Sequence, residues 1–160
     1  KEVNHVRNSF IRTEADELTY CFHIILRYEI EKAIFRDHVK VEELPALWNQ
    51  KMQEYSQITP TNDAEGILQD MHWSDGSFGY FPSYLLGSIY DGMYLDRLEE
   101  ELGSVDALLA EGRISEITKW LNEKIHQYGS TRSPKEVIRY VCGKEVSAEP
   151  LIRYFKDKSL

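Results

Sequence analysis

The chain has 160 residues, 12% of them aromatic, and a formal net charge of −8 at pH 7. This composition is typical of a folded domain of common size and excludes a disordered chain. The negative charge and the lack of a long basic run argue against nucleic acid and anionic membranes as partners. No stretch approaches the roughly 18 consecutive apolar residues of a membrane span.

The first predicted element is a long helix over residues 11–35, which contain neither glycine nor proline. Helical spacing predicts a core-facing stripe of Ala15, Leu18, Phe22, Ile25, Leu26 and Ala33. A second stripe is polar and consists of Arg12, Asp16, Thr19, Tyr20, His23, Arg27 and Glu31. These residue types suit a cleft in which donors and acceptors converge on a ligand. Side-chain pairs one turn apart, such as Arg12–Asp16 and Arg27–Glu31, are the simpler interpretation of the pattern alone.

Further helices are predicted along the rest of the chain. They cover Val41–Tyr55, Pro82 to about Leu102, residues 105–111, Ile114–Tyr128, a segment from the capping box at Ser133 to Gly143, and a last segment after Ser147 whose Leu151, Ile152 and Phe155 face inward. Residues 63–68 are expected to form a short helical turn, and residues 69–79 contain turn signals such as Asp75-Gly76. Gly87 and Gly92 within a helix indicate close helix contact or a bend. Because no alternating run suggests a sheet, the predicted fold is all-α, with residues 1–160 forming a single helical unit.

Few residues suggest chemistry on their own. No two histidines share helical ligand spacing, and there is no HExxH, CxxC or glycine-rich phosphate loop, so a self-contained zinc or nucleotide site is not expected. Cys21 and Cys142 are expected to be reduced, buried thiols of a cytoplasmic protein. His72, Tyr80 and Tyr84 lie around a glycine-bearing loop and could donate hydrogen bonds to an oxyanion. The alternative, slightly favoured on pattern alone, is an aromatic loop that packs its rings into the core.

Three segments resemble motifs of one known family. Residues 11–20, IRTEADELTY, resemble the IRxxADELTY signature of the carboxypeptidase Taq family. Residues 66–73, GILQDMHW, are similar to its GxxQDxHW motif, and residues 79–84, GYFPSY, to its GYFPxY motif. The three motifs occur in the same order as in the family, and the likeness spans nearly the whole chain.

The resemblance implies an all-α zinc metallocarboxypeptidase whose metal is held by an HExxH helix and a further glutamate. None of these ligands is present in this sequence. The resemblance therefore implies a C-terminal fragment of a larger, mostly helical catalytic domain, which supplies one wall of the cleft and no metal ligand. The intact cytoplasmic enzyme, expected to be a homodimer, would remove single amino acids from peptide C-termini by zinc-activated water. The fragment alone is expected to be inactive.

The resemblance also suggests roles for individual residues. Arg12 would bind the terminal carboxylate of the substrate through its guanidinium, and Asp16 would orient Arg12. His23 and Arg27, on the same polar stripe, are further candidates for substrate binding. His72, Tyr80 and Tyr84 would line the cleft and stabilise the oxyanion. Two alternatives remain: a non-catalytic all-α interaction module whose polar stripe docks a partner, and a paralogue that has lost its catalytic half.

Overall fold

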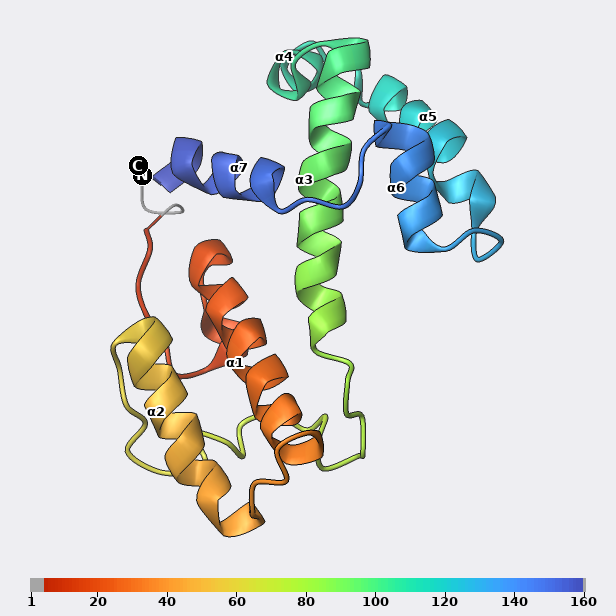
Figure 1. Cartoon of the computed structure of the whole chain (residues 1–160). Helices are drawn as coiled ribbons and strands as arrows, with labels where there is room; N and C mark the ends of the chain where they lie inside the picture. The colour runs from red at the N-terminus through yellow and green to blue at the C-terminus, as the bar shows by residue number, and fades with distance from the viewer. Residues whose placement is uncertain (1–4, 160) are drawn as a thin grey trace. The chain divides into compact units, whose positions relative to one another are not determined.

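The computed structural model describes residues 5–159, which form helices joined by turns and contain no strand. The α-helices, labelled in Figure 1, are α1 (Glu17–Phe35), α2 (Leu44–Ser56), α3 (Pro82–Leu102), α4 (Val105–Ala110), α5 (Ile114–Lys124), α6 (Pro134–Cys142) and α7 (Glu149–Ser159). Short 3-10 turns lie at Arg12–Glu14, Val41–Glu43 and His126–Tyr128. The all-α prediction is confirmed. Within the described part of the chain, every helix is too short or too polar to cross a membrane.

The chain divides into two compact units, and the division falls inside α3. The N-terminal unit ends at Leu86 and the C-terminal unit begins at Gly87. That residues 1–160 behave as a single folding unit therefore stays a prediction.

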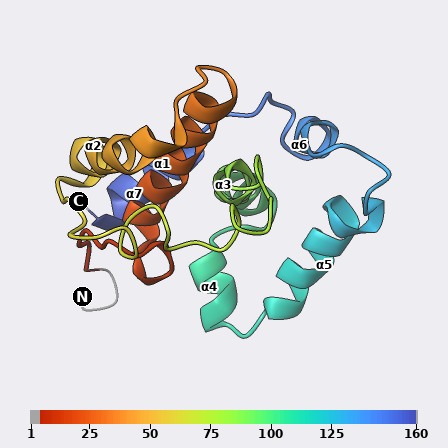
Figure 2. The same ribbon diagram turned by 90° about the horizontal axis from the view of Figure 1, so that it is seen from below.

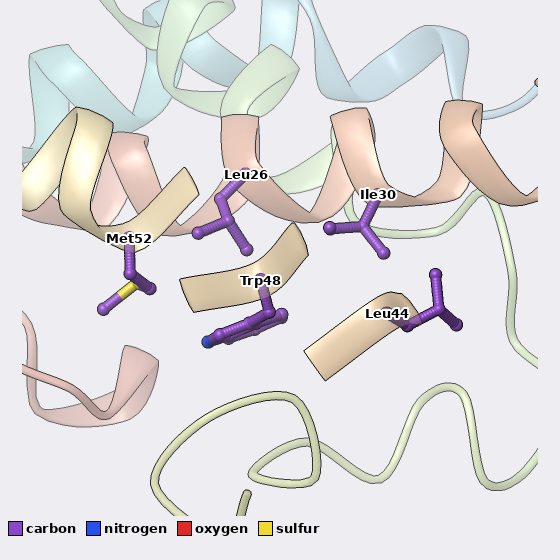
Figure 3. Close-up of a cluster of buried hydrophobic side chains, with 5 residues drawn as sticks. All are labelled: Leu26, Ile30, Leu44, Trp48 and Met52. Carbon is purple, nitrogen blue, oxygen red and sulfur yellow. The ribbon is translucent and has the colours of Figure 1, made fainter. Parts of the chain in front are cut away.

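In the N-terminal unit, α1 and α2 lie side by side, as Figures 1 and 2 both show. Leu44, Trp48 and Met52 recur every four residues and so form one stripe along α2. Leu26 and Ile30 of α1 point toward this stripe (Figure 3). Together these five buried side chains form the hydrophobic core that holds the two helices together.

The start of α1 differs from the prediction. The expected helix from Ile11 is interrupted: Arg12–Glu14 form a 3-10 turn, and α1 begins at Glu17. The Asp16 side chain caps the helix by accepting hydrogen bonds from the backbone N–H groups of Leu18 (3.1 Å) and Thr19 (2.9 Å). An aspartate that satisfies two N-terminal donors in this way fixes the first residue of a helix.

The burial of α1 also differs from the prediction. In the expected apolar stripe only Leu26 and Ala33 are buried, while Ala15, Leu18, Phe22 and Ile25 are half-buried. The buried polar residues of α1 are instead Thr19, His23, Arg27 and Glu31. The reason is that the segment between α2 and α3 contacts this face of α1, and its polar groups pair with those of the helix.

That segment, residues 57–81, is built of turns. The expected short turn over residues 63–68 is present as hydrogen-bonded turns and does not extend into a regular helix: the backbone N–H groups of Gly66 and Leu68 both donate to the Asp63 carbonyl oxygen. The expected turn at Asp75-Gly76 is confirmed, with Gly76 at φ 82° and Gly79 at φ 80°. Positive φ values of this kind favour glycine because a side chain would be strained there.

The C-terminal unit has a core of its own, formed by Leu98, Leu108, Trp120, Val137 and Val141. The predicted capping box of α6 is confirmed: Ser133 Oγ accepts from the Glu136 backbone N–H, and the Glu136 carboxylate accepts from the Ser133 backbone N–H at 2.7 Å.

A Cβ at Gly92 would lie 3.0 Å from the Leu151 backbone nitrogen, so this glycine permits the close approach of α3 and α7. Gly87 has no such neighbour. Leu151 is buried, but the inward orientation expected for Ile152 was wrong, because this side chain is 43% exposed.

Candidate functional site

Two arginines share one aspartate in the N-terminal unit. Arg12 donates to Asp70 Oδ1 from Nε (3.0 Å) and from Nη2 (2.7 Å). Arg27 donates from Nε to Asp70 Oδ2 at 2.6 Å, and its Nη2 contacts the same oxygen. The exposed fraction of the side chain is 11% for Arg12, 10% for Asp70 and 0% for Arg27. The three groups form a largely buried cluster with one net positive charge, which favours an anionic ligand.

The two arginines differ in what they can still bind. The remaining donors of Arg27 are engaged inside the protein, by the His23 carbonyl oxygen at 2.8 Å and by Gln69 Oε1 at 2.9 Å. Arg12 donates from Nη1 to the Tyr20 hydroxyl at 3.2 Å. A guanidinium has five N–H bonds, so its contacts with Asp70 and Tyr20 leave two N–H bonds of Arg12 without an acceptor among residues 5–159. Of the two side chains, only that of Arg12 is both partly exposed and able to donate further.

Gln69 fixes the backbone that carries Arg12. Its Oε1 accepts from the Arg12 backbone N–H at 2.8 Å, and its Nε2 donates to the Phe10 carbonyl oxygen at 2.8 Å. The same Nε2 lies within hydrogen-bonding distance of the Glu65 and Gly66 carbonyl oxygens. One amide therefore joins the 3-10 turn before α1 to the loop that contains Asp70.

The charges of the cluster shift the pKa values of its members. Burial opposes ionisation of Asp70, but the hydrogen bonds and charges of Arg12 and Arg27 outweigh it and hold the pKa of that carboxyl below 3.8. Burial lowers the pKa of Arg27 to about 10, so it remains a cation at neutral pH. Burial, together with the charge of Arg27, lowers the pKa of His23 to about 4. His23 is therefore neutral at pH 7.

Asp16 and His23 do not take the positions expected from the polar stripe. Asp16 accepts from backbone N–H groups, including that of Arg7 at 2.8 Å, and the expected pair with Arg12 is replaced by the Arg12–Asp70 pair. The expected Arg27–Glu31 pair was also wrong, because Arg27 binds Asp70 and Glu31 accepts from Trp73. His23 is 1% exposed and lies beside Arg27. Asp16 therefore caps α1, and His23 is buried beside Arg27 without direct contact to Arg12 among the described residues.

The other predicted residues form an aromatic cluster. His72 Nε2 lies 3.2 Å from the Tyr84 hydroxyl oxygen, and the His72 ring stacks on Tyr80 with ring centroids 5.6 Å apart. Phe81, which is fully buried, contacts the His72 ring at a centroid distance of 4.6 Å. Tyr80 is 51% exposed. Burial, together with the neighbouring Tyr80, raises the pKa of Tyr84 and keeps its hydroxyl protonated at neutral pH.

The arginine cluster and the aromatic cluster are contiguous. The Arg12 guanidinium carbon lies 5.4 Å from the ring centroid of Tyr84 and 5.6 Å from that of Phe81. Both rings also contact His72. The cation is therefore attracted by the faces of the same rings that hold the histidine. The structure brings Arg12, His72, Tyr80 and Tyr84 into one site that offers a cation with unused donors beside an imidazole and two phenols.

Sequence reasoning missed several residues that hold this site together, namely Asp70, Gln69, Phe81 and Glu31 in its pairing with the loop. Asp70 and Gln69 lie within the GILQDMHW motif, from which only the histidine was selected. The motif could have indicated them, because an aspartate can pair with a cationic side chain and a glutamine can hydrogen-bond to backbone groups.

In the part of the chain that the structure describes, no group of three or more His, Cys, Asp and Glu side chains could hold a metal ion. The residues of this site are also poor metal ligands, because Asp70 is occupied by two arginines. A resident metal centre therefore does not fit these residues.

Comparison with known proteins identifies the family. Residues 1–159 match the family described as Carboxypeptidase Taq (M32) metallopeptidase. The chain is 52% identical over 158 residues to Carboxypeptidase 1 of Bacillus subtilis (strain 168), covering 99% of this chain and 32% of that protein. It is 40% identical over 157 residues to Thermostable carboxypeptidase 1 of Pyrococcus furiosus, covering 98% of this chain and 32% of that protein.

Solved structures agree with these matches. The Pyrococcus furiosus carboxypeptidase structure superimposes with a TM-score of 0.95 at 39% identity, covering 99% of this chain and 32% of that one. Metallocarboxypeptidase 1 of Trypanosoma cruzi gives a TM-score of 0.94 at 38% identity, covering 99% of this chain and 33% of that one. The chain thus spans about a third of the length of the relatives that it matches. It belongs to the carboxypeptidase Taq family of metallopeptidases.

Proposed function

We propose that this chain forms the part of a metal-dependent carboxypeptidase that recognises the free C-terminus of a peptide substrate. The whole protein would remove single amino acids from peptide C-termini. The observation that carries this proposal is the state of Arg12: its cation is held by Asp70, it keeps two unused N–H bonds, and it lies against the rings that hold His72. Two N–H bonds of one guanidinium can bind both oxygens of a carboxylate.

Arg12 is the residue that would touch the substrate carboxylate. Asp70 and Gln69 would fix its side chain and its backbone, respectively. Arg27 and His23 would act behind the cluster, since both are buried, and Asp16 would act by capping α1. A buried counter-ion and buried supports preserve the geometry of a cation better than an exposed pair does.

His72, Tyr80 and Tyr84 would line the cleft beside the scissile bond. The Tyr84 hydroxyl is protonated at neutral pH, and imidazole and phenol groups can donate hydrogen bonds to an oxygen that gains negative charge. Donors fixed before the reaction stabilise such an oxyanion more effectively than mobile water does. The stacking of His72 on Tyr80 and its tilted contact with Phe81 support this role because they restrain the imidazole.

The metal belongs to another part of the whole protein in this proposal. We infer that it is zinc, held by residues outside this chain, and a bound zinc ion would activate the attacking water. The side chains described here would bind and orient the peptide and stabilise charge.

We also infer a cytoplasmic homodimer. The two cysteines, Cys21 and Cys142, are half-buried rather than fully buried as expected, and both are unpaired thiols, which is usual in a reducing compartment. Large apolar side chains such as Tyr28 and Phe35 are 46% and 59% exposed, and apolar surface of this kind supports association with further polypeptide.

The test is a chimaeric enzyme. This chain would replace the matching segment, 32% of the length, of the Bacillus subtilis relative. The proposal predicts a chimaera that releases C-terminal amino acids and loses this activity when a chelator removes its metal. A folded chimaera without activity would favour the alternative of a non-catalytic interaction module.

The substitution Arg12→Lys in the chimaera tests the residue that carries the proposal. Lysine keeps the charge beside Asp70 but loses the guanidinium fork, so kcat/KM should fall about 10- to 100-fold, or about 1.4–2.7 kcal/mol. Arg36→Lys is the matched control, because Arg36 is exposed and pairs only with Asp37 among the described residues. Unchanged kcat/KM together with a lowered melting temperature would assign Arg12 to the scaffold instead.

A further inference from the structure

Glu31 of α1 is a buried carboxylate with an unusual set of partners. Glu31 is 5% exposed, and its carboxylate forms no ion pair with any of residues 5–159. Its Oε1 accepts two hydrogen bonds, from the Trp73 indole Nε1 at 2.9 Å and from the Gly79 backbone nitrogen at 3.0 Å. Burial of a carboxylate without a cation is costly unless donors satisfy it. The buried Glu31 carboxylate therefore depends on these two donors for its stability.

The two donors lie at opposite ends of one loop. Trp73 follows His72 directly, and Gly79 directly precedes Tyr80. Between them the chain reverses through Gly76, at φ 82°, and the Ser77 backbone N–H donates to the His72 carbonyl oxygen at 2.8 Å. One carboxylate oxygen thus binds the residue after His72 and the residue before Tyr80, the two members of the stacked pair.

The ring contacts of Trp73 extend this restraint into the core. Its ring lies edge-on against Trp48 at a centroid distance of 6.1 Å and against Phe81 at 5.9 Å. Phe81 in turn contacts the His72 ring. Because the Glu31 hydrogen bond fixes the direction of the indole N–H, it also restrains the Trp73 ring against Phe81, the ring that contacts His72.

We propose that Glu31 is a positioning residue for His72 and Tyr80, which holds the loop between them closed through Trp73 and Gly79. It touches no substrate. The proposal rests on the proposed function for the roles of His72 and Tyr80 in catalysis, whereas the geometry that it assigns to Glu31 can be measured without activity.

The first experiment measures that geometry by NMR in the chain as it stands. In Glu31→Ala the Trp73 indole N–H should exchange with solvent at least about 10-fold faster than in the parent, and the His72 ring signals should move toward those of an unstacked histidine. Glu31→Gln keeps an acceptor oxygen and should retain both parent signals. If Glu31→Ala does not fold, Glu31→Gln still tests the proposal, because retained signals support it and lost signals contradict it.

Glu29→Ala is the matched control. Glu29 lies on the same helix, but its carboxylate contacts Lys51 and Tyr55 of α2. Its loss should lower the melting temperature without changing the Trp73 and His72 signals. Parent-like signals in Glu31→Ala would overturn the proposal, and so would signals in Glu31→Gln that are lost as completely as in Glu31→Ala.

The second experiment uses the active chimaera. Glu31→Ala should lower kcat about 10-fold and change KM by less than about 2-fold, because the carboxylate-binding Arg12 is left in place. Glu31→Gln should restore most of kcat. Equal changes in kcat for Glu31→Ala and Glu29→Ala would contradict a positioning role. If the parent chimaera itself is inactive, the proposed function fails while the NMR result still decides the position of Glu31.

Discussion

Arg12 and Arg27 bind the two oxygens of the same aspartate, yet only one of them can serve a ligand. Arg27 is fully buried and its donors are engaged by Asp70, Gln69 and the His23 carbonyl oxygen. Arg12 is partly exposed and keeps unused donors. The buried Arg27 therefore orients the Asp70 carboxylate, and that carboxylate orients the partly exposed Arg12.

Asp70→Asn should strongly destabilise the chain. It would leave Arg27 buried without a counter-charge, which costs about 3–5 kcal/mol of the free energy of unfolding. Urea unfolding at pH 7 measures this loss. Asp37→Asn is the control, since Asp37 forms an exposed pair with Arg36, and it should leave the urea midpoint unchanged.

Because of the Asp70 carboxylate, we expect the free energy of unfolding to fall at acid pH. The folded state holds the pKa of Asp70 below 3.8, so its contribution to stability is complete above the unfolded-state pKa and disappears as the pH falls through the lower, folded-state pKa. The parent chain should therefore lose more stability than Asp70→Asn when the pH is lowered below about 4. An equal loss of stability in the two proteins over this pH range would contradict a lowered pKa of Asp70 in the folded state.

At the scale of the elements, local signals predicted most helices. Pro82 in the first turn of α3 and the capping box at Ser133 of α6 lie where the sequence indicates. The start of α1 was missed because the helical spacing of residues 11–20 continues across Asp16, whereas Arg12 is held outside the helix by Asp70, 58 residues away. The partners of Glu31 were missed for the same reason: Trp73 is 42 residues away along the chain. Arg12, His72, Tyr80 and Tyr84 could be selected from motifs, but not the contacts that join them.

Asp16→Ala tests the start of α1. It removes a side chain that accepts from the Leu18 and Thr19 backbone N–H groups, which should cost about 0.5–2 kcal/mol of the free energy of unfolding. Asp16→Asn should recover most of this loss, because an asparagine Oδ1 caps helices about equally well, but it cannot accept from the Arg7 backbone N–H as Asp16 Oδ2 does. Thermal or urea unfolding gives both values, with Asp63→Ala as an exposed control in the same unit. Equal effects of Ala and Asn would contradict the capping role and would assign the effect to the charge of Asp16 or its bond to the Arg7 backbone.

At the scale of the whole molecule, the chain matches about a third of each relative, and its described residues contain no metal-binding cluster. In our proposal, metal chemistry and recognition of the peptide C-terminus therefore come from different parts of the polypeptide. In that proposal, a helical unit that carries the substrate-carboxylate site needs further chain for activity.

The chain alone should bind no stoichiometric zinc after dialysis and should release no amino acid from a peptide. The reason is that the ligands and the general base of the family lie outside it in our proposal. Metal analysis and a peptidase assay give the two values, and the metal-loaded chimaera is the positive control. Turnover by the isolated chain that a chelator abolishes would refute the division of roles.

The most direct test of the central claim compares two peptides that differ only at the C-terminus, one a free acid and one an amide. The parent chimaera should strongly prefer the free acid. Arg12→Ala should lower kcat/KM for the acid about 100-fold and leave that for the amide nearly unchanged, because only the acid offers a carboxylate to the guanidinium. If Arg12→Ala lowers kcat/KM equally for both peptides, or keeps the preference of the parent, Arg12 does not recognise the substrate carboxylate.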